Sequence, residues 1–175
     1  MTMANYKTLL SGITTFIFDY DGVLTDGHVL LTESGDALRM ANVKDGYALQ
    51  LAVKNGYHVA IISGGRSQSI KNRFDALEVH DVFLGVENKL GEFNEYLTRY
   101  GIKADEVLYM GDDIPDFELM QVAGLPTCPA DACEEIKSVA KYISGFKGGQ
   151  GCARDVIEQV MKIQGKWMNH LAFTW

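Results

Sequence analysis

The sequence at residues 14–23 decides the fold, and it reads Thr14-Thr15-Phe16-Ile17-Phe18-Asp19-Tyr20-Asp21-Gly22-Val23. Its first half, Thr14–Phe18, is apolar or β-branched throughout, which is typical of a strand buried on both faces of a sheet. Two carboxylates follow at once, separated by one residue. Because residues i and i+2 of an extended segment point the same way, we expect Asp19 and Asp21 on one side, roughly 7 Å apart along the chain. Gly22 then allows a sharp backbone turn.

The rest of the chain alternates short apolar runs with helical patterns. The runs predict five further strands, at His58–Ile62, Val82–Leu84, Val107–Met110, Leu125–Cys128 and Tyr142–Ile143. The helical patterns predict a helix capped by Asp45 and ended by Gly56, then helices at Ser67–Leu77, Asn88–Tyr100, Pro115–Ala123, Asp131–Ala140 and Cys152–Ile163. This order predicts one α/β domain over residues 1–175, a three-layer Rossmann-like parallel sheet with helices on both faces.

The segment at about residues 27–40 interrupts the alternation. It holds two apolar runs, Val29–Leu31 and Ala37–Met40, around the turn-rich residues 32–36. This pattern predicts a β-hairpin that protrudes from the first crossover, with apolar residues of the kind that mark an interface. The gaps between the motifs are already filled, so we expect no cap domain.

Composition narrows the class of protein. A net charge of −7 argues against a nucleic-acid or anionic-membrane partner and requires local positive charge wherever a phosphorylated substrate binds. The three cysteines, Cys128, Cys133 and Cys152, match no zinc pattern and are expected as free thiols. Residues 1–13 lack the features of a secretory signal, and no apolar run is long enough to span a membrane. We therefore expect a cytoplasmic protein.

A second acidic motif, Gly111-Asp112-Asp113-Ile114-Pro115-Asp116, follows the predicted strand Val107–Met110. Carboxyl ends of parallel strands meet at one edge of the sheet, so these acids are expected near Asp19. Like charges that gather in this way need a cation, and Mg²⁺ prefers oxygen ligands. Asp19 and Asp112 can supply two of them, whereas Asp116 either orients Lys89 or caps the following helix.

Two further strand ends carry groups suited to an anion. Ser63 and Gly64 follow the predicted strand His58–Ile62, where a hydroxyl and free backbone N–H groups can cradle a phosphate. Lys89 begins a helix, a place where the helix dipole mildly disfavours a cation, and this favours an anionic partner.

Together these motifs resemble the haloacid dehalogenase-like superfamily over nearly the whole chain. The resemblance implies that Asp19 is the nucleophile, that Asp21 is general acid and then general base, and that Ser63 and Lys89 bind the transferring phosphoryl group. It also implies that Asp19, the main-chain carbonyl of Asp21 and Asp112 hold Mg²⁺. Asp113 and Asp116 would support them. An acid at position 21 favours hydrolysis of phosphate esters.

Within that superfamily the chain resembles the capless 3-deoxy-D-manno-octulosonate 8-phosphate phosphatases of lipopolysaccharide biosynthesis. The stretches that carry this closer likeness are residues 21–27, 42–47, 85–89, 111–113 and 148–151. The resemblance implies a homotetramer in which hairpins pack together and a neighbouring subunit closes each site. It also implies 3-deoxy-D-manno-octulosonate 8-phosphate as the substrate, and a nine-carbon sugar-acid 9-phosphate is the alternative.

The contact for a substrate carboxylate is expected from an arginine. Arg66 and Arg73 are seven residues apart, so a helix through both would place them on one face, and a guanidinium suits a carboxylate. The chain departs from the family at Gly64-Gly65-Arg66, which has one more glycine than usual before the arginine. The hydrophobic tail, about residues 165–175, either packs on a neighbour or frays.

A different class of protein is a receiver-type phosphoacceptor domain, which also gathers aspartates, a hydroxyl and a lysine at the edge of a parallel sheet. Receivers carry adjacent acids after the first strand and the acceptor after the third. Here the acids after the first strand are spaced by one residue, and further acids follow the Val107–Met110 strand. The order of the motifs therefore favours the phosphatase.

Overall fold

The strand predicted at residues 14–18 is β1 (Thr15–Phe18), and it lies inside a parallel sheet. The structure is a computed structural model that describes residues 6–174. The order across this sheet is β5 (Asp81–Leu84), β4 (His58–Ser63), β1, β6 (Val107–Met110), β7 (Leu125–Cys128) and β8 (Tyr142–Ile143). Phe18 pairs with Ile61 on one side and Met110 on the other, so Asp19 leaves the sheet between the ends of two neighbours. The predicted parallel α/β architecture is confirmed.

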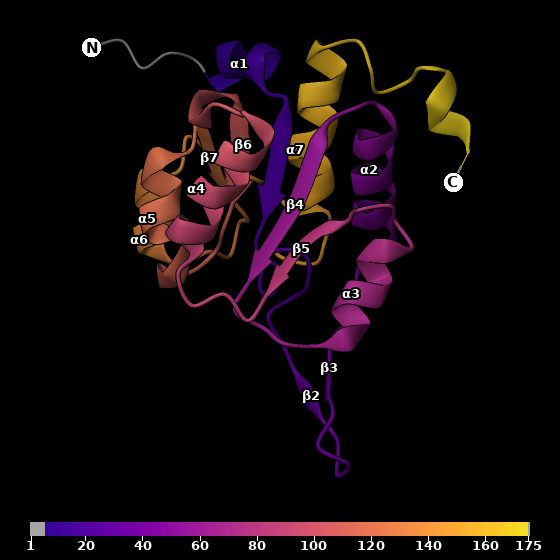
Figure 1. Cartoon of the computed structure of the whole chain (residues 1–175), viewed down its shortest axis with the longest axis vertical. Helices are drawn as coiled ribbons and strands as arrows, with labels where there is room; N and C mark the ends of the chain where they lie inside the picture. Colours follow the sequence, from indigo (N-terminus) through magenta and orange to yellow (C-terminus); the bar gives the residue numbers. More distant parts are fainter. Residues whose placement is uncertain (1–5, 175) are drawn as a thin grey trace.

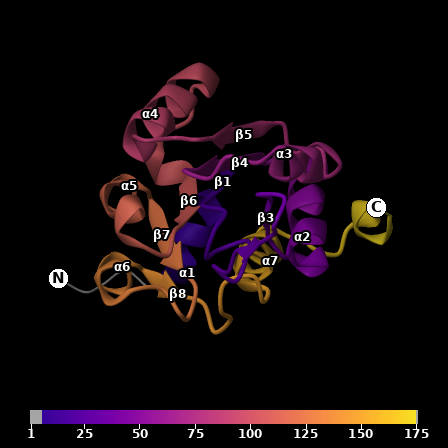
Figure 2. The ribbon, with the colours of Figure 1, turned by 90° about the horizontal axis from the view of Figure 1, so that it is seen from below.

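Helices cover both faces of the sheet (Figure 2). Phe16 and Phe18 are buried in one core, while Ile17 between them is buried in the other. The first core is covered by α2 (Val43–Lys54), α3 (Gln68–Asp75) and α7 (Cys152–Ile163), and the second by α4 (Lys89–Tyr100), α5 (Phe117–Val122) and α6 (Glu134–Val139). Each fully buried phenylalanine stabilises the fold by about 1.5–3 kcal/mol.

Short helical elements complete the chain, and the sequence did not indicate the first of them. They are α1 (Tyr6–Leu9) and the 3₁₀ turns η1 (Leu10–Gly12), η2 (Ala104–Glu106), η3 (Ile114–Asp116) and η4 (His170–Phe173). A four-residue helix has too few positions to show a 3.6-residue pattern, which is why α1 escapes such a search. Within residues 6–174, no helix combines the length and the apolar character needed to cross a bilayer.

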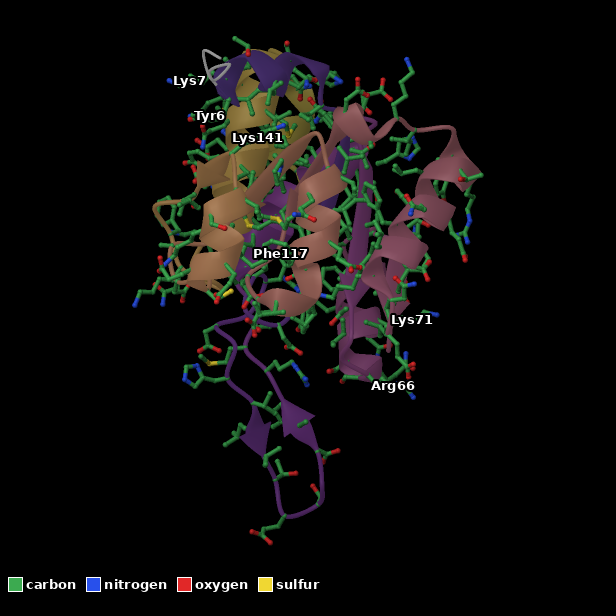
Figure 3. The ribbon with its side chains drawn as sticks, turned by 90° about the vertical axis from the view of Figure 1, so that its left-hand side faces the viewer. Tyr6, Lys7, Arg66, Lys71, Phe117 and Lys141 are labelled. Carbon is green, nitrogen blue, oxygen red and sulfur yellow. The ribbon has the colours of Figure 1, made fainter. Side chains whose placement is uncertain are left out.

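The hairpin after β1 projects away from the body of the molecule (Figures 1 and 3). Its strands, β2 (Leu30–Leu31) and β3 (Ala37–Leu38), are antiparallel and shorter than the apolar runs that predicted them. Gly35 allows the turn, because its φ of +88° lies in the left-handed region. Large apolar side chains on this segment are exposed, namely Val29, Leu30, Leu31, Leu38 and Met40.

Asp45 caps a helix, but not its own as the sequence predicted. Helix α2 begins at Val43, and its cap is Asn42, whose side chain accepts the N–H of Lys44 at 2.8 Å. The buried Asp45 carboxylate instead accepts the N–H of Arg154 at 2.7 Å and of Gly151 at 3.2 Å. It therefore caps α7 from a neighbouring helix, a long-range contact that local sequence patterns do not reveal.

The C-terminal segment packs on its own chain up to Thr174, beside α2 (Figure 1). Trp167 is buried, and the Arg154 guanidinium lies 5.2 Å from its ring centroid. Tyr47 on α2 donates its hydroxyl to the carbonyl of Ala172, and Lys54 donates to the carbonyl of Thr174 at 3.0 Å. These contacts correct the expectation of a segment that frays, while packing on a neighbouring subunit stays a prediction. Trp175 lies outside the described residues.

Replacing Asp45 by alanine should destabilise the protein by about 1–3 kcal/mol, because two backbone N–H groups of α7 lose their buried acceptor. Urea unfolding followed by far-UV circular dichroism measures this. Asp75→Ala, which removes an exposed carboxylate at the end of α3, is the matched control and should change stability by less than about 0.5 kcal/mol. Equal losses in the two variants would contradict the capping role.

Candidate active site

Three carboxylates converge beyond the carboxyl ends of the central strands. Asp19 follows β1, Asp112 lies two residues beyond β6, and Asp116 ends η3. One carboxylate oxygen from each lies within 4.8 Å of the others. Gly22 makes this approach possible, since its φ is +85° and a side chain there would overlap the Asp112 carboxylate. The structure thus brings together acids from two separate sequence motifs.

Lys89 binds two of these carboxylates from the first turn of α4. Its Nζ lies 3.0 Å from Asp19 Oδ1 and 2.6 Å from Asp116 Oδ1, and its side chain is only 7% exposed. Asp116 is held in turn by the Tyr109 hydroxyl at 2.6 Å and by the backbone N–H of Asp112 at 3.0 Å. Asp116 therefore orients Lys89, as one of the two roles considered from the sequence. It binds backbone just ahead of η3, but its side chain makes no cap hydrogen bond to α5, so the other role, capping of the following helix, is wrong.

Burial and like charge raise the pKa of the acids in this cluster. Desolvation raises the pKa of Asp112 to about 8, and the carboxylates of Asp19 and Asp116 add to the effect. The pKa of Asp19 is raised by desolvation and by Asp116, while Lys89 acts in the opposite sense. Desolvation opposes the charge of Lys89, but Asp19 and Asp116 outweigh it and raise its pKa. One lysine does not neutralise three carboxylates.

The donor set suits a divalent cation with oxygen ligands. Both oxygens of Asp116 are already engaged, Oδ1 by Lys89 and Tyr109 and Oδ2 by the Asp112 N–H. Asp19 and Asp112 are therefore the members of the cluster best placed to bind a cation. Burial and neighbouring negative charge raise the pKa values of Asp19 and Asp112, and a bound cation would offset that negative charge.

The remaining predicted polar groups surround the same space. Ser63 ends β4, is buried, and accepts the N–H of Gly65 through its hydroxyl at 3.1 Å. The cavity has a volume of about 520 Å³, which is ample for a phosphorylated sugar. The predicted residues that line it are Asp19, Asp21, Ser63, Gly64, Lys89, Asp112, Asp113 and Asp116. Asp113 is exposed and accepts the N–H of Ile114 at 2.9 Å, as a cap of η3.

Asp21 has a partner that sequence reasoning missed. The guanidinium of Arg39 binds it through two parallel hydrogen bonds, Nε to Oδ1 at 2.6 Å and Nη2 to Oδ2 at 3.0 Å. Arg39 directly follows β3, so the hairpin brings a cation to one of the acids that line the cavity. The available signal was its isolation, because it is the one arginine or lysine between Gly27 and Met40.

Arg66 and Arg73, the predicted carboxylate contacts, do not line the cavity within this chain. Arg66 is exposed beside Gly85 and lies at the start of α3, away from the hairpin (Figure 3). The two arginines do not share a helix face, since α3 begins only at Gln68 after the glycine-containing loop. Arg73 lies against Gly46 of α2, in a different hollow.

Known proteins resemble this chain along most of its length. Residues 81–154 match the family described as haloacid dehalogenase-like hydrolase. The 3-deoxy-D-manno-octulosonate 8-phosphate phosphatase of Salmonella typhi is 34% identical over 159 residues, which are 91% of this chain and 85% of that protein.

Solved structures agree with that match. The phosphatase of this name from Moraxella catarrhalis, crystallised with a magnesium ion, a phosphate ion and KDO, has a TM-score of 0.90 and 30% identity over 93% of this chain and 94% of its own. The cobalt-bound phosphatase from Haemophilus influenzae has a TM-score of 0.88 and 28% identity, over 94% and 98%.

The metal-free protein should lose stability as the pH rises. Folded Asp112, with a pKa of about 8, keeps a proton that the unfolded chain releases near pH 4, so the unfolded state binds fewer protons between these values. The free energy of unfolding should fall by about 0.5–1 kcal/mol per pH unit between pH 5 and pH 7, allowing for solvent screening. Urea unfolding in EDTA measures it.

Asp112→Asn should flatten this slope, while Asp113→Asn, at the exposed neighbouring position, should leave it as in the wild type. Parallel curves for the wild type and Asp112→Asn would show that Asp112 is not held protonated by its surroundings.

Proposed function

The chain belongs to the haloacid dehalogenase-like hydrolases, within the family of 3-deoxy-D-manno-octulosonate 8-phosphate phosphatases, and from that membership we propose that it is a Mg²⁺-dependent phosphomonoesterase acting on a phosphorylated keto-deoxy sugar acid. The proposed substrate is 3-deoxy-D-manno-octulosonate 8-phosphate. One observation carries the proposal, namely that Lys89 binds Asp19 in a cavity where carboxylate oxygens of Asp19 and Asp112 lie within 4.8 Å of each other. A nine-carbon sugar-acid 9-phosphate is the second substrate to be compared.

The residues at this site suit a magnesium ion. Mg²⁺ would be held by the carboxylates of Asp19 and Asp112, whose oxygens are not all engaged, and by the main-chain carbonyl of Asp21. When bound, Mg²⁺ would offset the negative charge of the phosphoryl oxygens and of the acids around it. The same charge keeps Asp19 and Asp112 ionised at neutral pH, against the effect of burial.

In the first half of the proposed reaction, a carboxylate oxygen of Asp19 attacks the phosphorus atom. The bond between phosphorus and the sugar oxygen breaks, and that oxygen takes a proton from Asp21. Lys89 and Ser63 bind the equatorial phosphoryl oxygens, where charge spreads in the transition state. The contact with Asp116 holds Lys89 in place beforehand, so its ammonium group needs no rearrangement as the charge develops.

In the second half, Asp21 takes a proton from a water molecule that attacks the phosphorus of phosphorylated Asp19. The bond between phosphorus and Asp19 breaks, inorganic phosphate leaves, and the Asp19 carboxylate is restored. Protonation of the leaving alkoxide alone contributes roughly 10²–10⁴ in rate. This use of Asp21 distinguishes the proposal from the receiver-type alternative, in which phosphate would remain on the acceptor without turnover.

We propose further that the enzyme is a homotetramer whose neighbouring subunit helps to close the cavity. The support is the hairpin, where Leu31 is 76% exposed and Met40 is 75% exposed on an element that projects from the body. Exposed apolar side chains gathered on one element are typical of an interface. Light scattering tests the assembly, and a monomer at working concentration would contradict it.

The proposed location is the cytoplasm, where the free thiols Cys128, Cys133 and Cys152 stay reduced. The net charge of −7 fits a small-molecule substrate and neither a nucleic-acid nor a membrane partner. The carboxylate contact expected of Arg66 or Arg73 stays a prediction, which requires that assembly or motion bring one of them to a cavity.

A panel of phosphorylated compounds tests the substrate. We expect kcat/KM for 3-deoxy-D-manno-octulosonate 8-phosphate to exceed that for mannose 6-phosphate by at least about 10²-fold, because a site that pairs with a carboxylate rejects substrates that lack it. The nine-carbon sugar-acid 9-phosphate belongs in the same panel. If no sugar-acid phosphate exceeds the simple sugar phosphates, the substrate assignment is wrong while the phosphatase chemistry stands.

A further inference from the structure

We infer that Arg39 is the substrate-binding residue that recognises the carboxylate of the sugar acid, and that it does so by exchanging Asp21 for the substrate. This rests on the proposed function, since it assumes a substrate that carries both a phosphate and a carboxylate. Binding of the substrate carboxylate to Arg39 would thereby release Asp21, which then acts as general acid on the leaving oxygen.

Arg39 is held at the cavity with its donors aligned. Its side chain is 13% exposed, and Nη1 donates to the carbonyl of Ala37 at 3.0 Å while Nε and Nη2 bind Asp21. The guanidinium is therefore fixed by the hairpin and by one carboxylate. A planar fork of this kind matches the two oxygens of any carboxylate, with shorter and stronger bonds than neutral groups form.

The pair cannot persist through the proposed reaction. Both oxygens of Asp21 are engaged by Arg39, at 2.6 and 3.0 Å, although Asp21 lines the cavity and has to face the leaving oxygen. The Asp21 side chain is 35% exposed, and ion pairs that water reaches contribute little to stability. An incoming carboxylate can therefore take its place without a large loss.

A substrate carboxylate offers Arg39 the same partner that it gives up. The guanidinium keeps two charge-assisted hydrogen bonds, now to the substrate, and both oxygens of Asp21 become free. One of them takes up a proton from solvent, and this is the proton that Asp21 then gives to the leaving oxygen. A phosphate ester without a carboxylate has nothing to exchange, so Arg39 stays on Asp21. The preference for sugar acids would then arise because only they free Asp21, the general acid for the leaving group.

The surroundings favour Arg39 over the arginines of the β4–α3 region. Gly65 lies beside the ion pair, since a Cβ there would lie 3.2 Å from Asp21 Oδ2 and 3.7 Å from Arg39 Nη2. Arg66 lies beside Gly85, and Arg73 lies against Gly46. Lys89 is taken up by Asp19 and Asp116. Among residues 6–174, Arg39 is the arginine that forms an ion pair with an acid lining the cavity.

Binding to a catalytically silenced enzyme tests the inference. In an Asp19→Asn background with Mg²⁺, calorimetry compares 3-deoxy-D-manno-octulosonate 8-phosphate with its methyl ester, in which one methyl group replaces the carboxylate charge. We expect the acid to bind about 10–100-fold more tightly than the ester, the range of a charged hydrogen-bond pair. Adding Arg39→Ala should abolish this ratio, and adding Arg39→Lys should restore part of it, because charge returns without the fork.

Arg99→Ala is the matched control, because it removes a guanidinium near the far end of α4, about 15 Å along the helix from Lys89. It should leave the ratio unchanged. Equal weakening of acid and ester by Arg39→Ala, or loss of the ratio in Arg66→Ala or Arg73→Ala instead, would overturn the inference.

The same ligands separate this inference from the proposed function. If the Asp19→Asn protein binds acid and ester equally, the role of Arg39 is refuted even where the wild-type enzyme hydrolyses the sugar-acid phosphate. If the ratio depends on Arg39 but the wild type releases no phosphate from that compound, the recognition step stands and the proposed function fails.

Discussion

The ion pair between buried Lys89 and the carboxylates of Asp19 and Asp116 is the interaction on which the rest of the site depends. Three acids at one sheet edge repel one another, and burial adds the cost of desolvation. Lys89 offsets part of that cost from the start of α4. Because one lysine does not offset the charge of three carboxylates, the cluster suits a divalent cation.

Each supporting contact serves that arrangement. Tyr109 and the backbone of Asp112 hold Asp116, so Lys89 points at Asp19 before any substrate arrives. Gly22 leaves room for Asp112. The hairpin carries two separate features, since its apolar side chains are exposed while Arg39 at its base binds Asp21, which lines the cavity. In the proposed tetramer, this one inserted element would link the way subunits meet to what the cavity recognises.

The sequence predicted the sheet well because strands buried on both faces are apolar at nearly every position, as in Thr15–Phe18 and Val107–Met110. The acids after these strands could be placed together because parallel strands end at one edge. Long-range contacts could not be predicted. Asp45 caps α7 across more than a hundred residues, and Arg39 reaches Asp21 only through the fold of the hairpin. Arg66 and Arg73 were paired by helical spacing, but α3 begins after Arg66.

The central claim is that Asp19 carries the phosphoryl group between substrate and water. Rapid acid quenching of the Asp21→Asn enzyme with Mg²⁺ and p-nitrophenyl phosphate, followed by peptide mass spectrometry, tests it most directly. An aryl leaving group needs little protonation, whereas the amide cannot take a proton from water, so phosphorylated enzyme should accumulate with the adduct on Asp19. A burst of p-nitrophenol with the phosphoryl group on another residue, or steady phosphate release with no adduct in either enzyme, would contradict the account.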